Sequence, residues 1–414
     1  MLGQKLVLAG GGHAMLPSLL RARDWIRNGL EVTLVDPHPY LYYSGMVPEY
    51  LGGVYRQEEV RIDLRRLCKK AGIDYVQGRV AAVDALDRQV TTSDGTALPY
   101  DLLAVDIGGV NPNPPAGVIP SKPITETEAL ARHIRATLSD AAASLSLAIV
   151  GGGAAGVEVA LNVTARFESA GRSADLELTI LEARPDLLPS FPAGLRTDME
   201  ARLHRRGIQV LTGVKASRIQ NGTITTSGAA PSVHADAIFW ATGAVGPDLF
   251  ARSGLPTDDD GFVRADPTLQ VEDSNRIFAA GDCATLTGYE DLAKVGVHAV
   301  KQGPVLRRNL ERSLRQIRLE GKPAGRDSLT AFRPYPATPL ILSTGIPEGI
   351  WTTGSVWWSG ASALRLKHWI DRRWMQTYNP AWDGRPMRRL ADTKAAARRS
   401  FENERPSPSS AVPA

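Results

Sequence analysis

Two glycine clusters, each followed further along by an acidic residue that ends an apolar run, are the parts of this sequence best suited to chemistry. Glycines there allow a tight turn that brings backbone amides against a pyrophosphate at a helix start, and the acid can accept hydrogen bonds from ribose hydroxyls. The residues are Gly10, Gly12 and Asp36 in the first set, and Gly151, Gly153, Gly156 and Glu182 in the second.

The second set completes the pattern GxGxxG and is a strong indication of a dinucleotide site, whereas the first has Met15 at the third glycine position. Taken alone, the first set also fits an ordinary strand-to-helix turn. An acid at position 182 favours the free 2′-hydroxyl of NADH, although Arg184 nearby could accept the 2′-phosphate of NADPH.

Two shorter motifs also end apolar runs. Gly243 closes DAIFWATG, which fits a chain crossing close to a bound dinucleotide or a plain turn, and Gly281 and Asp282 close NRIFAAGD. A Gly-Asp pair after a strand can place the carboxylate on a cofactor hydroxyl, and it can equally be a helix cap.

The elements that must position these residues form an internal repeat. Residues 5–36 and 145–182 each read as strand, glycine cluster, helix and second strand, with the runs KLVLAG and EVTLVD in one copy and LSLAIV and LELTILE in the other. Two βαβ units predict an α/β protein with two Rossmann-like parallel-sheet domains, the second inserted into the first.

Composition limits the functional class. The 414 residues are long enough for two or three domains, and no apolar run reaches the length of about 18 residues that spans a bilayer. The N-terminal run reads as a first strand, so we expect a cytoplasmic protein. Eleven Lys or Arg stand against five Asp or Glu from Ala361 to Ala414, so the net charge of +4 belongs to that end and does not indicate nucleic-acid binding.

The only two cysteines, Cys68 and Cys283, are far apart in the sequence. They form no CxxC or CxxxxC motif, which excludes a local redox disulfide and a cysteine-rich metal site. We expect both to be buried and no metal to be bound.

The order of these parts resembles the FAD-dependent pyridine nucleotide-disulfide oxidoreductase superfamily, in the branch that holds type II NADH dehydrogenases. The segments PYLYYSGMVPEYLGG, YDLLAVDIGG (in place of the usual YDxLxxATG), AKVGVHAVKQGP and LKHWIDRRWM further resemble the flavoprotein found fused to, or standing beside, selenophosphate synthetase. The resemblance covers about residues 5–380. It implies an FAD domain at 1–120 and 246–330, an NAD(P) domain at 121–245, a C-terminal α+β region at 331–400, and a disordered tail at 401–414.

The resemblance also implies roles for individual residues. Those matching FAD contacts are Gly10, Gly12, Asp36, Tyr43, Ser44, Val80, Gly108, Gly281 and Asp282, and those matching nicotinamide-dinucleotide contacts are Gly151, Gly153, Gly156, Glu182 and Gly243. Glu158 matches a glutamate beside nicotinamide and flavin, or is an exposed helix acid. Lys294 could stabilise charge on a reduced flavin, or be solvated, and His13 could contact the pyrophosphate.

Departures from the family pattern bear on the electron acceptor. The AQxAxQ segment that lines the quinone pocket of type II NADH dehydrogenases is replaced by residues 297–302, VHAVKQ, which keep only Gln302 and place His298 at the first glutamine. Quinone remains a plausible acceptor, whereas sulfide oxidation needs a cysteine pair that this chain lacks.

The stretch 364–375 predicts an amphipathic helix. Leu366, Trp369, Ile370 and Trp374 recur at helical spacing among Arg365, Lys367, Arg372 and Arg373. Such a helix can lie in a membrane interface, pack in the protein core, or form the seam of a homodimer.

Together these features predict an FAD-dependent oxidoreductase that passes hydride from NADH to flavin and electrons onward to a quinone, in the cytoplasm or at the inner face of the membrane. Two alternatives stay open: an accessory or redox-sensing flavoprotein, possibly tied to selenium metabolism, and a reductase of a soluble electron-carrier protein.

Overall fold

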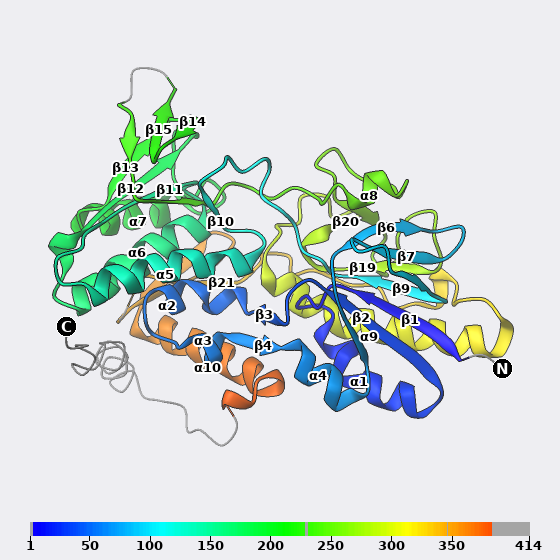
Figure 1. The fold of residues 1–414 in the computed structure, drawn as a ribbon. Coiled ribbons are helices and arrows are strands. Elements are labelled where there is room, and N and C mark those ends of the chain that lie inside the picture. The colour runs from blue at the N-terminus through cyan, green and yellow to red at the C-terminus, as the bar shows by residue number, and fades with distance from the viewer. Residues whose placement is uncertain (1–2, 228–230, 346, 383–414) are drawn as a thin grey trace, which may run out of the picture. The chain divides into compact units, whose positions relative to one another are not determined.

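The computed structural model describes residues 3–227, 231–345 and 347–382, and the contacts between them divide the chain into two units (Figure 1). Unit 1 contains residues 3–43, 61–110 and 244–335, and unit 2 contains 44–60, 111–243 and the described residues from 336 on. The tail expected at 401–414 lies outside the described residues.

Unit 1 is built on a five-stranded parallel sheet in the order β19-β9-β1-β2-β5. These strands are β1 (Gln4–Ala9), β2 (Leu30–Asp36), β5 (Asp74–Gln77), β9 (Leu102–Val105) and β19 (Ile277–Ala279). Helix α1 (Leu16–Arg27) packs against α4 (Leu64–Ala71) and against the long α9 (Gly296–Glu320). The antiparallel sheet of β6 (Val80–Asp84), β7 (Gln89–Thr92) and β8 (Ala97–Pro99) shares a hydrophobic core with the parallel strands.

Smaller elements complete unit 1. They are β3 (Tyr40–Tyr42) paired with β4 (Arg61–Asp63), α8 (Leu249–Arg252), and β18 (Val263–Ala265) paired with β20 (Ala284–Leu286).

Unit 2 repeats the design with a parallel sheet in the order β10-β17-β11-β12-β13. These strands are β10 (Ile119–Pro120), β11 (Leu145–Val150), β12 (Leu176–Glu182), β13 (Gln209–Thr212) and β17 (Ala237–Trp240), with α5 (Thr127–Ser139), α6 (Ala154–Ser169) and α7 (Ala193–Arg205) between them. A small antiparallel sheet of β14 (Ala216–Gln220), β15 (Thr223–Thr226) and β16 (Val233–His234) adjoins it. The prediction of an α/β fold with two Rossmann-like sheets is confirmed.

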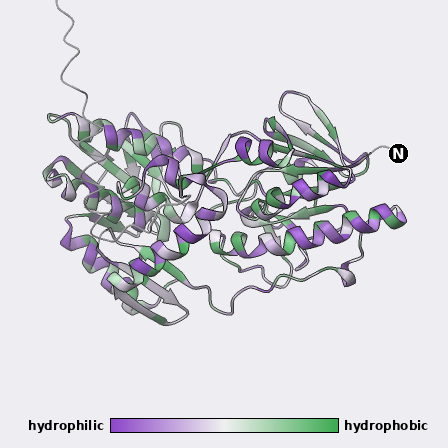
Figure 2. Cartoon of the chain, turned by 90° about the horizontal axis from the view of Figure 1, so that it is seen from below, coloured by the Kyte–Doolittle hydropathy of each residue, from purple (hydrophilic) through white to green (hydrophobic). Residues whose placement is uncertain are grey.

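The C-terminal region is α+β, as expected. A three-stranded sheet of β21 (Leu340–Ser343), β22 (Gly349–Thr353) and β23 (Val356–Gly360) leads into α10 (Ala361–Tyr378), which packs on all three strands. In the hydropathy colouring of Figure 2, helices of the chain carry both hydrophilic and hydrophobic turns. Within the described residues, no helix is both long enough and apolar enough to cross a bilayer.

The grouping differs from the expected boundaries in three places. Residues 44–60, which include α2 (Val47–Leu51) and α3 (Gln57–Val60), and residues 111–120, which include β10, were expected in the first domain and belong to unit 2. The described residues from 336 on, expected as a region of their own, also group with unit 2. The physical reasons are that β10 pairs with β17, and that α2 packs on α6 and α5 and is joined to α10 by the buried contacts of Glu49 described below.

Helix α9 is anchored within unit 1 by the buried side chain of Asn309. Its amide nitrogen donates to the carbonyl oxygens of Thr268 (2.7 Å) and Thr330 (2.8 Å), and its oxygen accepts from the amide of Thr330 (2.8 Å). Truncating Asn309 therefore leaves buried backbone groups without partners.

We expect Asn309→Ala to lower the free energy of unfolding by about 2–4 kcal/mol, as measured by chemical denaturation. Arg308→Ala is the matched control, because Arg308 is exposed on the same helix and its bond is to the carbonyl of Pro304 one turn away. Equal effects of the two changes would contradict the anchoring role.

Candidate functional site

The two glycine loops are held by the same set of hydrogen bonds. After β1, Gly10 donates its amide to the carbonyl of Val35 (2.8 Å), and Gly11 donates to Oδ2 of Asp36 (2.7 Å). After β11, Gly151 donates to the carbonyl of Leu181 (2.8 Å), and the amide of Gly152 donates to Oε2 of Glu182 (2.7 Å). Each acid thus fixes the middle glycine of its own loop.

The second oxygen of each acid is also held by the backbone. Oδ1 of Asp36 accepts from the amide of His38 (2.8 Å), and Oε1 of Glu182 accepts from the amide of Arg184 (2.8 Å). Burial raises the pKa of Asp36, while the amides of Gly11 and His38 favour its charged form. Both carboxylates keep further lone pairs that can accept hydroxyl hydrogen bonds.

Close packing explains why glycine stands at several of these positions. A Cβ on Gly10, whose φ is +86°, would lie 2.3 Å from the carbonyl oxygen of Asp106, and one on Gly151 (φ +119°) would lie 2.4 Å from that of Ala241. A Cβ on Gly156 would lie 2.0 Å from the carbonyl oxygen of Gly151, so the third glycine of the second loop is required sterically. At the matching position of the first loop, Met15 is accommodated with its side chain fully buried.

Other loop glycines border open space. A Cβ on Gly108, Gly153 or Gly243 would meet nothing within 4 Å. The Thr242 hydroxyl, beside Gly243, is buried and has no hydrogen-bond partner among the described residues. In both units, bare backbone thus borders the space that the phosphates and ribose of a dinucleotide would need, and the residues present fit such a ligand.

The Gly-Asp motif is held by α9, and Asp106 lies between this motif and the first loop. Gly281 begins a 3-10 turn, Gly281–Cys283, and donates its amide to Oε1 of Gln302 (2.6 Å). A Cβ on Gly281 would lie 2.3 Å from Oδ1 of Asp106, which also fills the space beside Gly12. The sequence reasoning did not select Asp106, although the acid at this place in YDLLAVDIGG was a visible departure.

Asp106 is 3% exposed and accepts the amides of Ala14 (2.8 Å) and Met15 (3.0 Å) on Oδ2. Burial raises the pKa of Asp106 to about 7, against these two amides, which favour its charged form. The first loop is therefore in contact with an acid whose pKa lies near 7.

Two candidates of unit 1, Asp282 and Lys294, line a small hollow together with His298 and Gln302 of α9. Lys294 donates to the carbonyl of Ala284 (2.5 Å) and to the hydroxyl of Thr285 (2.9 Å), and its Nζ lies 4.2 Å from the centre of the Phe262 ring. It is therefore only partly exposed, not a fully solvated lysine.

Three further candidates lie in unit 1. The rings of His13 and Tyr43 are 5.6 Å apart, and burial lowers the pKa of His13 to about 4, so that its imidazole is neutral at pH 7. Val80 is buried at the start of β6, in the core that the two sheets share. Cys68 and Cys283 are both buried, as expected.

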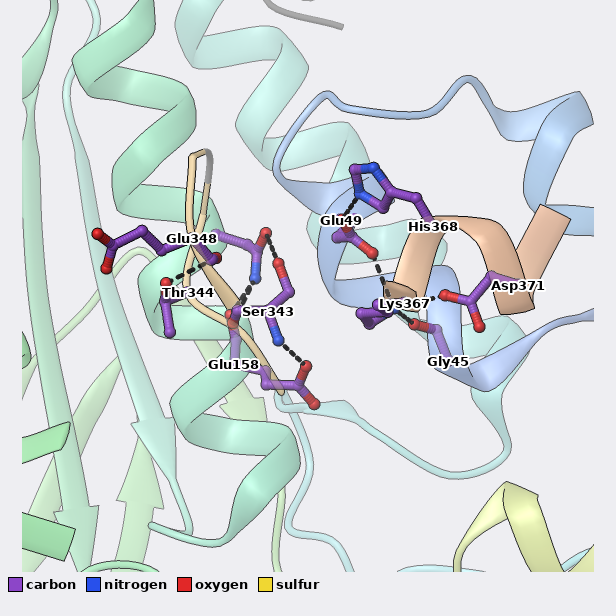
Figure 3. A network of polar contacts seen from close by, with 10 residues as sticks. Gly45, Glu49, Glu158, Ser343, Thr344, Glu348, Lys367, His368 and Asp371 are labelled. Atoms are coloured by element: carbon purple, nitrogen blue, oxygen red, sulfur yellow. Dashed lines mark hydrogen bonds and ion pairs between the residues drawn. The ribbon is translucent and has the colours of Figure 1, made fainter. Parts of the chain in front are cut away.

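Glu158 lies one turn into α6 and turns toward β21 (Figure 3). Its Oε1 accepts the amide of Ser343 (2.7 Å). Burial raises the pKa of Glu158 to about 7, although Lys367 and the Ser343 amide favour the charged form. It is thus a partly buried carboxyl with a raised pKa and not an exposed helix acid.

A cluster of buried charges joins α2 to α10, as Figure 3 shows. Lys367 donates to Glu49 (2.8 Å), to Asp371 (2.7 Å) and to the carbonyl of Gly45, and His368 lies 2.5 Å from the second oxygen of Glu49. Despite burial, which alone would raise it, Lys367 and His368 lower the pKa of Glu49 to about 2. Gly45 follows Ser44, so α10 fixes the backbone next to that candidate.

The orientation of α10 differs from one of the expected alternatives. Lys367 and Arg372, predicted among the basic residues around the apolar stripe, are buried, and Arg372 lies over the rings of Tyr55 (5.7 Å) and Trp382 (5.6 Å). The apolar stripe faces outward instead: Leu366 is 37%, Trp369 48% and Ile370 42% exposed. Core packing of Leu366, Trp369 and Ile370 is therefore wrong. The inward side of α10 instead carries Lys367, which is paired with Glu49 of α2 and with Asp371.

Comparisons of the sequence with a protein family and with individual proteins agree with one another. The sequence pattern of the pyridine nucleotide-disulphide oxidoreductase family matches residues 4–303. A demethylphylloquinone reductase from Synechocystis sp. is 26% identical over 294 residues, which cover 68% of this chain and 72% of that protein. A type II NADH:quinone oxidoreductase from Staphylococcus aureus is 25% identical over 396 residues, covering 89% and 94%.

Among solved structures, NDH2 from Plasmodium falciparum in complex with NADH superposes with a TM-score of 0.75 at 15% identity, covering 93% of this chain and 100% of that one. At this identity the likeness establishes the fold alone.

The raised pKa of Glu158 predicts a pH dependence of stability. Its pKa is about 7 in the folded protein against an ordinary value of 4.5, so the folded state binds more protons between these values and stability is lost as the pH rises through that window. In Glu158→Gln we expect the free energy of unfolding to fall less between pH 4.5 and 7.5 than in the wild type, by on the order of 1–3 kcal/mol.

Chemical denaturation at the two pH values measures this difference. Glu168→Gln is the control, since it removes an exposed carboxylate from the same helix. Parallel pH profiles for the wild type and Glu158→Gln would show that Glu158 does not titrate in this window.

Proposed function

This chain belongs to the pyridine nucleotide-disulphide oxidoreductase family, and we propose that it is an FAD-dependent NADH:quinone oxidoreductase. The observation that carries the proposal is the duplicated loop, in which an acid at the end of the second strand holds the middle glycine in both sheets. Relatives over most of the chain length are named as a demethylphylloquinone reductase and as type II NADH:quinone oxidoreductases.

We assign FAD to unit 1 and NADH to unit 2. The FAD residues, as the resemblance implies them, are Gly10, Gly12, His13, Asp36, Tyr43, Ser44, Val80, Gly108, Gly281 and Asp282, and the NADH residues are Gly151, Gly153, Gly156, Glu182 and Gly243. In each loop the bare glycine backbone lets the phosphates approach the start of the following helix, while the acid accepts ribose hydroxyls.

NADH is favoured over NADPH by Glu182. Both of its oxygens are fixed by backbone amides, so its carboxylate cannot swing away from a 2′-phosphate, and the two negative charges would repel. The side chain of Arg184 is exposed, and only its amide is engaged with Glu182.

Bound FAD supplies hydride acceptance from NADH and the return of two electrons to a second acceptor. NADH, one proton and a quinone yield NAD⁺ and a quinol, so one proton must come from the protein or the solvent. Glu158, whose pKa is about 7, is suited to hold such a proton at neutral pH. Lys294 contributes positive charge at the Gly-Asp turn.

We propose a quinone as the electron acceptor because the relatives are named as quinone reductases. Gln302, the one glutamine kept from the quinone-pocket pattern, is 4% exposed and accepts the amide of Gly281, and His298 is 3% exposed. This segment therefore supports the Gly-Asp turn from α9.

We also propose the finer likeness to the flavoprotein associated with selenophosphate synthetase. Two segments quoted for it, PYLYYSGMVPEYLGG and LKHWIDRRWM, are the ones that meet in the buried cluster of Glu49, Lys367 and His368. An accessory or sensing role in selenium metabolism would then replace quinone turnover.

Peripheral membrane attachment through α10 is part of the proposal. Leu366, Trp369 and Ile370 are exposed on this helix together with Arg365 and Arg373, the arrangement that buries apolar side chains in a bilayer interface and places cations at anionic headgroups of the inner face. The competing explanation is a homodimer whose interface covers the same residues.

Under anaerobic conditions, we expect NADH to bleach the flavin absorbance near 450 nm and a short-chain quinone to restore it rapidly. Bleaching without reoxidation by any quinone would move the function to another acceptor or to sensing. No bleaching at all would reject the oxidoreductase.

Two variants separate the cofactor sites in the same assay. Asp36→Ala should release FAD, because the carboxylate proposed to accept the ribose hydroxyls and its hydrogen bond from Gly11 are both lost. Glu182→Ala should stay yellow and need more NADH for half-maximal bleaching. A yellow Asp36→Ala protein with normal flavin content would contradict the assignment of unit 1.

Replacing Leu366, Trp369 and Ile370 together by Ser should weaken binding to anionic phospholipid vesicles by about tenfold or more in a flotation assay. Leu86→Ser is the control, since Leu86 is 94% exposed in unit 1. Unchanged vesicle binding with a loss of dimer in sedimentation would assign these residues to a subunit interface.

A further inference from the structure

A carboxyl from outside the first glycine loop, that of Asp106, packs against this loop. Asp106 follows β9, and its Oδ2 accepts the amides of Ala14 and Met15 at the start of α1. Its Cγ and Oδ1 occupy the space that a side chain on Gly12 would need, and Oδ1 also borders Gly281. The acid is thus enclosed by the loop, the helix start and the Gly-Asp turn.

The second loop provides an internal comparison. The carbonyl oxygens of Asp106 and Ala241 lie in the same relation to the first glycine of their loops, 2.3 Å and 2.4 Å from the Cβ positions of Gly10 and Gly151. At this place the NADH loop thus has a methyl group, while the FAD loop has a carboxyl. The acid is therefore not required by the βαβ geometry itself.

We propose that Asp106 is a proton-binding group of the FAD site, whose carboxyl must be protonated for the FAD phosphates to share the start of α1, so that FAD binding takes up one proton. This inference rests on the proposed function, since it takes FAD as the ligand of unit 1. It adds a residue and a linked proton that the family assignment does not include.

Electrostatics around Asp106 support this coupling. Asp36 from β2 and Asp282 from the Gly-Asp turn are both acidic and disfavour a further negative charge there. His13 from the loop is neutral at pH 7, with a pKa of about 4, and the pKa of the Cys283 thiol is raised to about 12, so neither adds a compensating cation.

The groups that α9 and the segment before it present compensate little of that charge. The pKa of His298 is lowered by burial and by Lys301, and Gln302 is uncharged. Lys294 places its positive charge at the Gly-Asp turn, where it donates to the carbonyl of Ala284 and the hydroxyl of Thr285, and the groups that most favour the charged form of Asp106 are the amides of Met15 and Ala14. A charged Asp106 and two phosphate charges would therefore meet with little neutralisation, and protonation of Asp106 relieves the repulsion.

The sign of the pH dependence follows. Without FAD the pKa of Asp106 is about 7, and nearby phosphate charges raise it further in the complex. Below pH 7 the proton is already present and affinity is unaffected. Above it, the dissociation constant of FAD should rise by about tenfold per pH unit until the pKa of the complex is reached.

The test measures flavin retention by the full chain. Holoprotein is diluted at pH 6 to 9, and released FAD is quantified by its fluorescence at equilibrium. In the wild type we expect the dissociation constant to be constant below pH 7 and to rise by about tenfold per unit above it.

Asp106→Asn keeps an oxygen for the amides of Ala14 and Met15 and replaces Oδ1 by a neutral NH₂ group, as in the protonated acid. We expect its FAD affinity to be nearly independent of pH and tighter than that of the wild type at pH 8.5. Asp84→Asn is the control, since the Asp84 carboxylate also accepts two backbone amides, from Leu86 (2.9 Å) and Asp87 (2.8 Å), at the far end of β6. It should retain the wild-type pH profile.

An FAD dissociation constant that does not change with pH in the wild type, or the same slope in Asp106→Asn, would overturn the inference while leaving FAD as the cofactor. Absence of flavin at pH 6 in the wild type would instead reject the proposed function, and the inference with it. If Asp106→Asn does not fold, the proton count still decides: calorimetric FAD binding to wild-type protein in two buffers of different ionisation enthalpy should show uptake approaching one proton at pH 8, and zero uptake rejects the inference.

Discussion

The hydrogen bond from the middle glycine of each loop to the acid that ends the next strand is the interaction on which both units depend. It ties Gly11 to Asp36 and Gly152 to Glu182, so one contact positions both the turn that we propose to face the phosphates and the carboxylate that we propose to face the ribose. Because parallel strands deliver their carboxyl ends to one edge of the sheet, the acid and the loop meet there without any further element. The same contact gives both carboxylates a structural role besides the binding role proposed for them.

Much of this arrangement was predictable because it is local. Strand, glycine turn, helix and acid lie within one βαβ unit, and the steric demand at Gly156 or Gly10 comes from neighbours in that unit or in the adjacent strand. The burial of Lys367 on α10 was not predictable, because Glu49, with which Lys367 pairs, is 318 residues away along the chain. A helical plot ranks Leu366, Trp369 and Ile370 as the buried side, and only the distant carboxylate reverses that order.

Asp106 shows a different limit. The departure in YDLLAVDIGG was visible in the sequence, yet its meaning depends on which amides and which glycines surround the side chain. Those surroundings come from the loop at residues 10–15 and from the turn at 281–283, so a single substitution in a familiar motif becomes interpretable only once three segments are placed together. The assigned cofactor contacts of Tyr43, Ser44 and Val80 remain predictions from the resemblance.

The discontinuity of both units has a consequence for how the protein is made. The parallel sheet of unit 2 is formed by strands between Ile119 and Trp240, so it can assemble from one continuous stretch as the ribosome delivers it. The sheet of unit 1 must wait longer, because β19 pairs with β9 and the whole stretch that forms the sheet of unit 2 lies between these two strands. The contact of α2 with α10 within unit 2 also forms late, because Glu49 cannot meet Lys367 until α10 has been synthesised. Long sequence separation between contacts slows folding and prolongs exposure of apolar surface. We therefore expect the sheet of unit 2 to fold before the sheet of unit 1. The apolar strands of unit 1 then depend on chaperones until β19 has been synthesised.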